Sequence, residues 1–373
     1  MAEDNKNNTK QLKARHRGRI AQVGIYFVKF LRMFVYQSDW KVLPMSALIA
    51  GIVAFVLGRG YMKTMEGTMT GTFALVCVCI WNGCFNSIQV ICREREVVKR
   101  EHRSGMHISS YILSHMLYQF LLCMLQAIIT ILVTKEVGMR YPEQGLFTKW
   151  FLVDFGFTIF LITYAADMMS LFISALSHSP TAAMTIMPFL LVFQLIFSGG
   201  IISIPKASEP IAKLTISSPG FKALAAQADV NSRRYATVTR MLGKMGDTEI
   251  EVTVTVGQIL DLLEKNEKTS NVDPAESEKI SQIKEKLSKY KKVQSYKEQQ
   301  IPIKVTLGEL MDMVGEKEVK AMIDEGARKA SYKPEYEHSK DNIVHNWLHM
   351  SLFIFIFSVL SIIILEFIDL DKR

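Results

Sequence analysis

The stretch CREREVVKREHRSGMHISS, from Cys92 to Ser110, is a charged segment between two long apolar runs. It mixes charged residues of both signs: Arg93, Glu94, Arg95, Glu96, Lys99, Arg100, Glu101 and Arg103. Each uncompensated charge costs several kcal/mol inside hydrocarbon, so this stretch cannot lie in the membrane interior. We therefore predict a short helix in the aqueous phase that connects two membrane spans.

The apolar runs on either side belong to a set of windows of roughly 20 residues that carry almost no charge. About 20 apolar residues in a helix suffice to cross a hydrocarbon core of about 30 Å. Because 49% of the 373 residues are hydrophobic and they are clustered in this way, we predict an all-α polytopic membrane domain with six transmembrane helices. The predicted spans are residues 42–58, 70–91, 111–134, 150–177, 182–204 and 347–367.

Residues 1–41 precede the first predicted span as a basic tail followed by a helical pattern over residues 20–36. Lys29 and Arg32 interrupt the apolar residues of that helix, which is typical of a helix lying in the membrane interface. The ragged start of the first span is the alternative interpretation. We expect residues 1–41 to form a cytoplasmic tail and an interfacial connecting helix.

Lysine and arginine are densest in this tail and in the 92–110 stretch, and short basic flanks mark the cytoplasmic side of a span. Both regions are therefore predicted to be cytoplasmic. With six spans, residues 343–373 provide the sixth span and a short tail that is also cytoplasmic. The prediction is a multi-pass cell-membrane protein, which we assign to a bacterial plasma membrane, with residues 205–342 on its outer side.

The outer segment 205–342, inserted between the fifth and sixth spans, contains an internal repeat. IEVTVTVGQILDLL at residues 250–263 aligns without gaps on IPIKVTLGELMDMV at residues 301–314. In each copy, alternating β-branched residues give way to a helical apolar spacing, with a Thr-x-x-Gln/Glu capping box at the change. Each copy reads as a strand that runs into a helix, which predicts a small α+β extracytoplasmic domain.

The sequence carries none of the common catalytic motifs. It has no GxxxxGK[ST] phosphate loop, no HExxH and no GxSxG, and its five cysteines match no zinc spacing. We therefore predict that the chain is not an enzyme and holds no metal or cofactor of its own. The net charge of +8 comes from basic residues beside the spans, which favours membrane lipids over nucleic acid as a partner.

Two segments resemble the permeases of ABC-2 type transporters, especially the G-subfamily exporters. EREVVKREHRSGMHISSYILS at residues 94–114 resembles the segment that joins the second and third spans of these proteins. SALSHSPTAAMTIMPFLLVFQLIFSGGIISIP at residues 174–205 resembles their turn between the fourth and fifth spans. The positions that match in the first segment are Glu94, Arg95, Arg100, Glu101, Gly105 and Tyr111.

The resemblance implies that the 92–110 stretch is a coupling helix, which takes force from an ATP-binding subunit and passes it to the spans. The residues expected to carry this coupling are Glu94, Arg95, Glu96, Arg100, Glu101 and Gly105. The resemblance also implies a separate ABC ATP-binding subunit, which carries the ATP and magnesium, and a second permease subunit. The sequence leaves open the substrate, the choice between homodimer and heterodimer, and the role of residues 205–342.

A protein of another class remains as the alternative function. The spans could anchor a non-transporting membrane protein that displays residues 205–342 as a sensor or binding module. A third possibility retains the ATP-driven complex but transmits force to an outer partner instead of moving a substrate.

Polar residues inside the predicted spans are the candidates for a substrate path. Asn82 and Asn86 lie four residues apart, on one face of the second span. Phe193, Gln194 and Phe197 could form a matching wall on the fifth span. The alternative is that the amides bind neighbouring helices, which is the more common use of amides in membranes.

Asp167 is an acidic residue deep in the fourth predicted span. A carboxylate at this depth is expected to be functional or to have a partner. The candidate partners are the hydroxyls of Thr163 and Ser170, and a position near the cytoplasmic interface is a further alternative.

Overall fold

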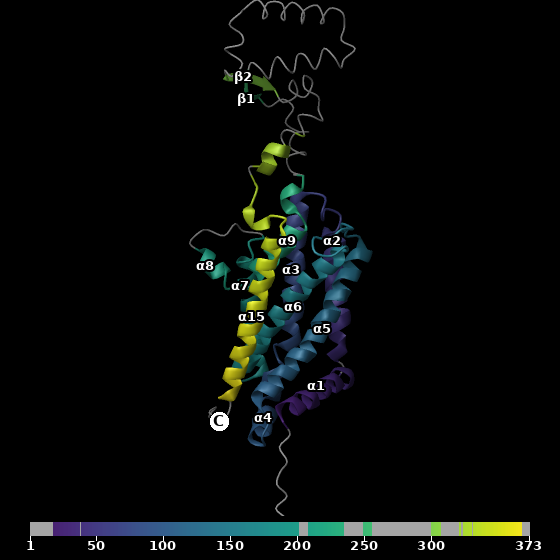
Figure 1. Ribbon diagram of the computed structural model, residues 1–373, viewed down its shortest axis with the longest axis vertical. Coiled ribbons are helices and arrows are strands. Elements are labelled where there is room, and N and C mark those ends of the chain that lie inside the picture. The colour runs from purple at the N-terminus through teal and green to yellow at the C-terminus, as the bar shows by residue number, and fades with distance from the viewer. Residues whose placement is uncertain are drawn as a thin grey trace, which may run out of the picture. The chain divides into compact units, whose positions relative to one another are not determined.

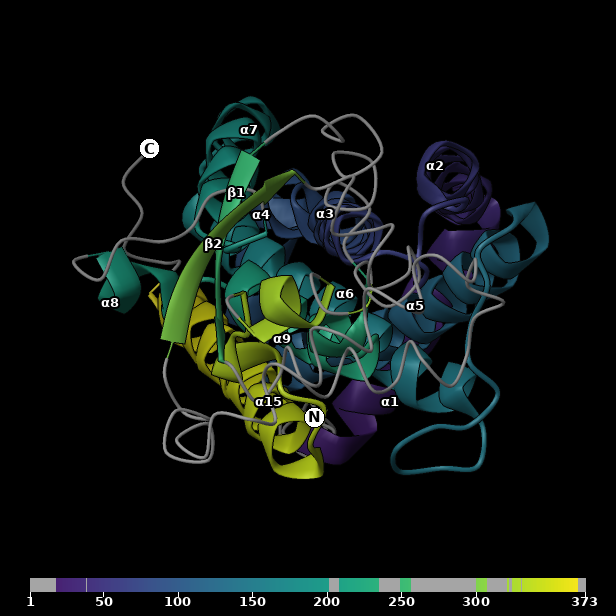
Figure 2. The same ribbon diagram turned by 90° about the horizontal axis from the view of Figure 1, so that it is seen from above.

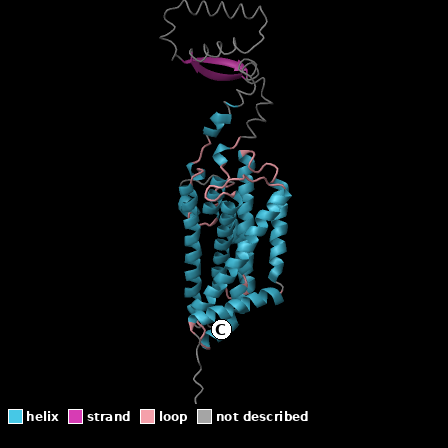
Figure 3. Cartoon of the chain, turned by 45° about the vertical axis from the view of Figure 1, so that its right-hand side comes forward, coloured by secondary structure: helices cyan, strands magenta, loops and turns pink. Residues whose placement is uncertain are grey.

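The computed structural model describes residues 18–37, 39–200, 208–234, 249–255, 300–306, 321, 324–329 and 331–367. The chain forms two compact units, of which the first contains residues 1–233 and 333–373 and the second contains residues 234–332. The first unit is a bundle of long helices, and one helix runs across an end of the bundle (Figures 1 and 3).

Five helical segments of the described chain are long and apolar enough to cross a membrane. They are Asp39–Leu57, Met65–Arg103, Ile108–Val137, Phe151–Leu176 and Lys340–Glu366. The first contains the 3-10 turn η1 (Asp39–Lys41) and α2 (Val42–Leu57), and the second contains α3 (Met65–Ser87) and α4 (Val90–Arg103). The other three are α5, α6 and α15, and together the five make the chain a mostly helical membrane protein.

The fifth predicted span, over residues 182–204, corresponds to the shorter helix α7 (Pro180–Ile196). Its 17 residues reach about 25 Å at 1.5 Å per residue, which is less than the usual hydrocarbon thickness. Residues 201–207 lie outside the described chain. The count of six spans therefore stays a prediction.

Helix α6 (Phe151–Leu176) forms the centre of the first unit, where α3, α5 and α15 pack around it (Figure 2). Its residues are buried on nearly every side, which suits its continuous apolar sequence. Gly83 of α3 permits the close contact, because a Cβ atom there would collide with the backbone carbonyl of Thr163. The α3–α6 interface is thus set by backbone contact as well as by side chains.

Helix α1 (Arg19–Tyr36) coincides with the helix predicted over residues 20–36. It runs across the end of the bundle, beside α4 and the first turns of α5 (Ile108–Val137) (Figures 1 and 3). This orientation is the one expected of an amphipathic helix at an interface.

Residues 208–233, which we assigned to the outer segment 205–342, pack with the helical bundle instead. They include α8 (Glu209–Ala212) and α9 (Ser217–Gln227), and α9 lies against α3, α6 and α15. Small residues make this packing possible, since a Cβ at Gly220 would press on Ile162 of α6. The first compact unit therefore includes residues up to 233, and the predicted outer position of residues 205–342 stays a prediction.

The second unit contains one antiparallel strand pair among its described residues. Strand β1 (Glu249–Thr255) pairs with β2 (Gln300–Thr306), and Glu249 lies opposite Thr306. The strands coincide with the first half of each copy of the repeat. The second halves, residues 256–263 and 307–314, lie outside the described residues, so the α+β domain and its outer location stay predictions.

Candidate functional site

The charged stretch forms α4, which begins at Val90 directly after α3. The helix ends at Arg103, whereas we predicted helix to continue to residue 110. Gly105 explains the earlier end, because its φ of 100° lies in the left-handed region that stops an α-helix. The chain then turns and enters α5 at Ile108.

The N-terminus of α4 is attached to the C-terminus of α6. Ser174 of α6 accepts hydrogen bonds from the backbone N–H groups of Ile91 and Cys92, at 3.0 and 3.1 Å. The first N–H groups of a helix lack intrahelical partners, so Ser174 acts as an N-cap supplied by another helix. The sequence of α4 itself provides no side-chain cap at Gln89.

Arg95 forms a second link at the same junction. Its guanidinium donates to the carbonyl oxygens of Ala175 and Ser177, at 2.8 and 3.3 Å. These carbonyls end α6, where the helix dipole concentrates negative charge, so a cation is favoured there. Each helix therefore satisfies the unpaired backbone groups at the end of the other, and we call this pair of links the α6 clamp.

The C-terminal end of α4 is attached to α1 by Gln22. Its side-chain NH₂ donates to the carbonyl oxygen of Gly105 at 3.2 Å, and its side-chain oxygen accepts from the backbone N–H of His107 at 2.9 Å. The turn between α4 and α5 is thus held by one amide side chain, which is buried in the helix that crosses the bundle.

Tyr26 and Lys29 continue this attachment along α1. The Tyr26 hydroxyl donates to Glu101 at 3.0 Å, and Lys29 lies 3.6 Å from Glu94 and 3.8 Å from Glu101. Burial, followed by the charge of Glu101 and the hydrogen bond to it, holds the pKa of Tyr26 well above its usual value, so the phenol remains a donor. We call the contacts of Gln22, Tyr26 and Lys29 the α1 clamp.

The six predicted coupling residues fall into two groups in the structure. Glu96 and Arg100 are exposed on the outer face of α4. The other four make the contacts of the two clamps: Glu94, Arg95, Glu101 and Gly105. Ser174 and Gln22 were not predicted from the sequence, because a serine and a glutamine in long helical patterns carry no local signal of a distant cap.

The two predicted amides on α3 bind neighbouring helices. Asn82 donates to the Ser46 hydroxyl of α2 at 2.8 Å. Asn86 exchanges two hydrogen bonds with Gln126 of α5, at 2.8 and 3.0 Å. These are the interhelical bonds that we gave as the alternative to a substrate path.

Asp167 is fully buried in α6, and its polar contacts differ from those we expected. The Cys123 thiol of α5 lies 3.8 Å from one carboxylate oxygen, and the other oxygen has no hydrogen-bond partner among the described residues. The Thr163 hydroxyl instead donates to the carbonyl of Ile159. The carboxylate therefore lies among α3, α5 and α6 and does not bond the hydroxyls nearest in sequence.

The three residues of the predicted wall on α7 make two different kinds of contact. Gln194 is buried, and its side-chain oxygen accepts from the backbone N–H groups of Ile216 and Ser217, each at 3.0 Å. It thereby caps the start of α9. The rings of Phe193 and Phe197 contact each other in a tilted arrangement with centroids 4.9 Å apart, and Phe193 is exposed.

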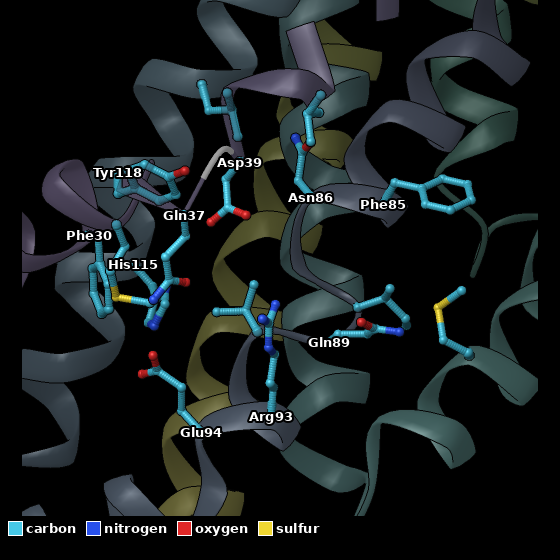
Figure 4. Close-up of a pocket in the computed structure, with 16 residues that line it drawn as sticks. Phe30, Gln37, Asp39, Phe85, Asn86, Gln89, Arg93, Glu94, His115 and Tyr118 are labelled. Atoms are coloured by element: carbon cyan, nitrogen blue, oxygen red, sulfur yellow. The ribbon is translucent and has the colours of Figure 1, made fainter. Parts of the chain in front are cut away.

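A cavity of about 420 Å³ opens where α1, α2, α3, α4, α5 and α7 approach one another (Figure 4). Of the six candidates for a substrate path, Asn86 is the one that lines it. The charged residues of its wall are Asp39, Arg93 and Glu94. In the described part of the chain, no group of three or more His, Cys, Asp or Glu residues is placed to hold a metal ion.

A bundle of membrane-length helices, with a charged helix bonded to α6 at one end and to α1 at the other, defines a polytopic membrane domain. Residues 25–226 match the family model for ABC-2 type transporters, which is more than half of the chain. The chain therefore belongs to the ABC-2 type transporter family, and the resemblance seen in the sequence is confirmed.

A relative of known family supports the same assignment. Over 208 residues the chain is 27% identical to ABC transporter G family member 4 of Arabidopsis thaliana. The similarity covers 54% of this chain and 35% of that protein, so the chain matches about a third of the relative's length.

Proposed function

We propose that the chain is the permease subunit of an ATP-driven transporter and that a separate ABC ATP-binding subunit energises it. Membership of the ABC-2 family supports the permease role. ATP and magnesium would bind to the partner subunit, because this chain carries no phosphate-binding loop. A second permease subunit would complete the membrane part, and export is the proposed direction of transport.

The clamps of α4 are the observation that carries this proposal. A helix that receives force must move its neighbours instead of bending away from them. The α6 clamp and the α1 clamp fix α4 at both of its ends, while Glu96 and Arg100 remain exposed. The partner would push on these exposed side chains, and the clamps would pass the displacement to α6 and α1.

The proposed topology has six spans, with α7 as the fifth, and cytoplasmic termini. The concentration of lysine and arginine in α1 and α4 supports a cytoplasmic position for that end of the bundle. Residues 234–332 would then lie outside the cell, and a bacterial plasma membrane is the proposed location.

The test is the charge reversal Arg100→Glu, assayed in the complex that co-purifies with the full chain. We expect co-purification with an ABC ATP-binding subunit and a loss of substrate-stimulated ATP hydrolysis in the variant. The matched control is Arg140→Glu, an exposed arginine after the far end of α5. If no ATP-binding subunit co-purifies, the permease assignment is wrong and a non-transporting membrane protein is favoured.

A further inference from the structure

The cavity in Figure 4 contains opposite charges that are not joined to each other. Asp39 and Arg93 point toward each other from opposite walls, and the charge of Arg93 acts on Asp39. Among the described residues, no direct ion pair joins the two side chains. The third charge, that of Glu94, is already balanced by Lys29 at 3.6 Å. The cavity therefore offers one free anion and one free cation that face each other across open space.

A buried histidine belongs to the same wall. His115 of α5 is 1% exposed, and neither ring nitrogen has a hydrogen-bond partner in the described part of the chain. Its ring stacks on Phe30 with centroids 3.8 Å apart, which fixes its orientation at the cavity. Both nitrogens are also shielded from solvent, so His115 contributes its ring to the cavity wall and no hydrogen bond to a ligand.

One side of the wall is apolar and exposed. Phe85 of α3 points away from the charged groups, and it is 42% exposed. Met184 of α7 lines the same cavity and is 36% exposed. Since both helices lie in the membrane part of the chain, this side suits a hydrocarbon chain. The volume of about 420 Å³ falls in the usual range of small-molecule sites, about 300–1,000 Å³.

We propose that this cavity binds the headgroup of a zwitterionic amphiphile. The ammonium group lies against Asp39, and the phosphate or carboxylate lies against Arg93. The acyl or alkyl chain leaves past Phe85 and Met184. This assignment rests on the geometry of the cavity and does not depend on the proposed transport function.

The test is the binding of dihexanoyl phosphatidylethanolamine to the full chain in detergent micelles, measured by isothermal titration calorimetry. Hexanoyl phosphatidylglycerol, which lacks the ammonium, and hexylamine, which lacks the phosphate, are the comparison probes. We expect the zwitterion to bind at least about tenfold more tightly than either probe, because each charge-assisted hydrogen bond contributes at least that factor.

Variants of the two charges separate this site from general lipid adsorption. Asp39→Asn and Arg93→Gln are each expected to weaken binding of the zwitterion about tenfold, while Arg93→Lys retains most of it. The matched controls are Asp341→Asn and Arg32→Gln, which replace exposed charges outside the cavity wall and should leave binding unchanged. Both replaced pocket charges are exposed, so the variants are expected to fold.

Two results would overturn the proposal: equal affinity for all three probes, or equal affinity in the wild type and both charge variants. Transfer of a labelled probe across the membrane of vesicles that contain the energised complex then distinguishes a transported substrate from a resident membrane lipid. Loss of transfer in Asp39→Asn marks a transported substrate, and unchanged transfer with weakened binding marks a resident membrane lipid. The binding assay needs no ATP-binding subunit, so its failure is distinct from failure of the co-purification test.

Discussion

The α6 clamp makes a local prediction that can be measured at single helical turns. Ser174→Ala removes the acceptor of two hydrogen bonds and leaves the buried N–H groups of Ile91 and Cys92 without partners. Loss of an N-cap costs about 0.5–2 kcal/mol, and we expect about 1.4 kcal/mol here because both N–H groups are affected. That free energy corresponds to about tenfold in the equilibrium for opening the first turn of α4.

Hydrogen exchange with mass spectrometry measures this opening directly. In the variant, peptides that cover residues 90–95 should exchange about tenfold faster, while peptides from the middle of α6 keep their rate. The control is Ser358→Ala, a buried serine of α15 whose hydroxyl bonds only within its own helix. If Ser174→Ala leaves the exchange of residues 90–95 unchanged, the clamp does not hold α4 and the reasoning about its rigidity fails.

Four further variants test other contacts. Tyr26→Phe should weaken the α1 clamp by about 1 kcal/mol, measured as faster hydrogen exchange at residues 101–107. In the wild type, spectrophotometric titration should show that Tyr26 ionises only above the usual tyrosine pKa of about 10. Gly83→Ala should lower the thermal midpoint through a clash worth about 1–3 kcal/mol, whereas Gly24→Ala, with open space around its Cβ, should not. His115→Leu should raise the thermal midpoint, since it removes a buried imidazole that has no hydrogen-bond partner among the described residues. Asn86→Leu should destabilise the protein more than the double variant that also removes its Gln126 partner, and additive effects in this cycle would contradict the paired amides.

The features that could be predicted from the sequence are those with a strong local pattern. The charged residues of α4 predict a position outside the hydrocarbon, because charge is costly there. The long apolar runs are sufficient to identify the membrane-length helices α2, α3, α5, α6 and α15. The internal repeat predicted the positions of both strands, because alternating β-branched residues are a local signal of a strand. The end of α4 was placed too late, although Gly105 offered the signal that a helix stops.

The features that the sequence did not reveal depend on contacts between distant segments. Helix α9 has the short sequence SSPGFKALAAQ, which is neither long nor apolar enough to be recognised as part of a bundle. Its position depends on Gln194, which caps it from α7, and on small residues that fit against α6. Ser174 and Gln22 were missed for the same reason, since each binds backbone groups more than 80 residues away.

The central claim is that the ATP-binding subunit acts on the exposed face of α4. Chemical cross-linking of the purified complex from a single introduced cysteine tests it most directly. Arg100→Cys should cross-link to the ABC ATP-binding subunit, whereas Arg140→Cys, after the far end of the 30-residue helix α5, should not. Cross-linking from position 140 but not from position 100 would contradict the claim and place the partner at the opposite end of the bundle.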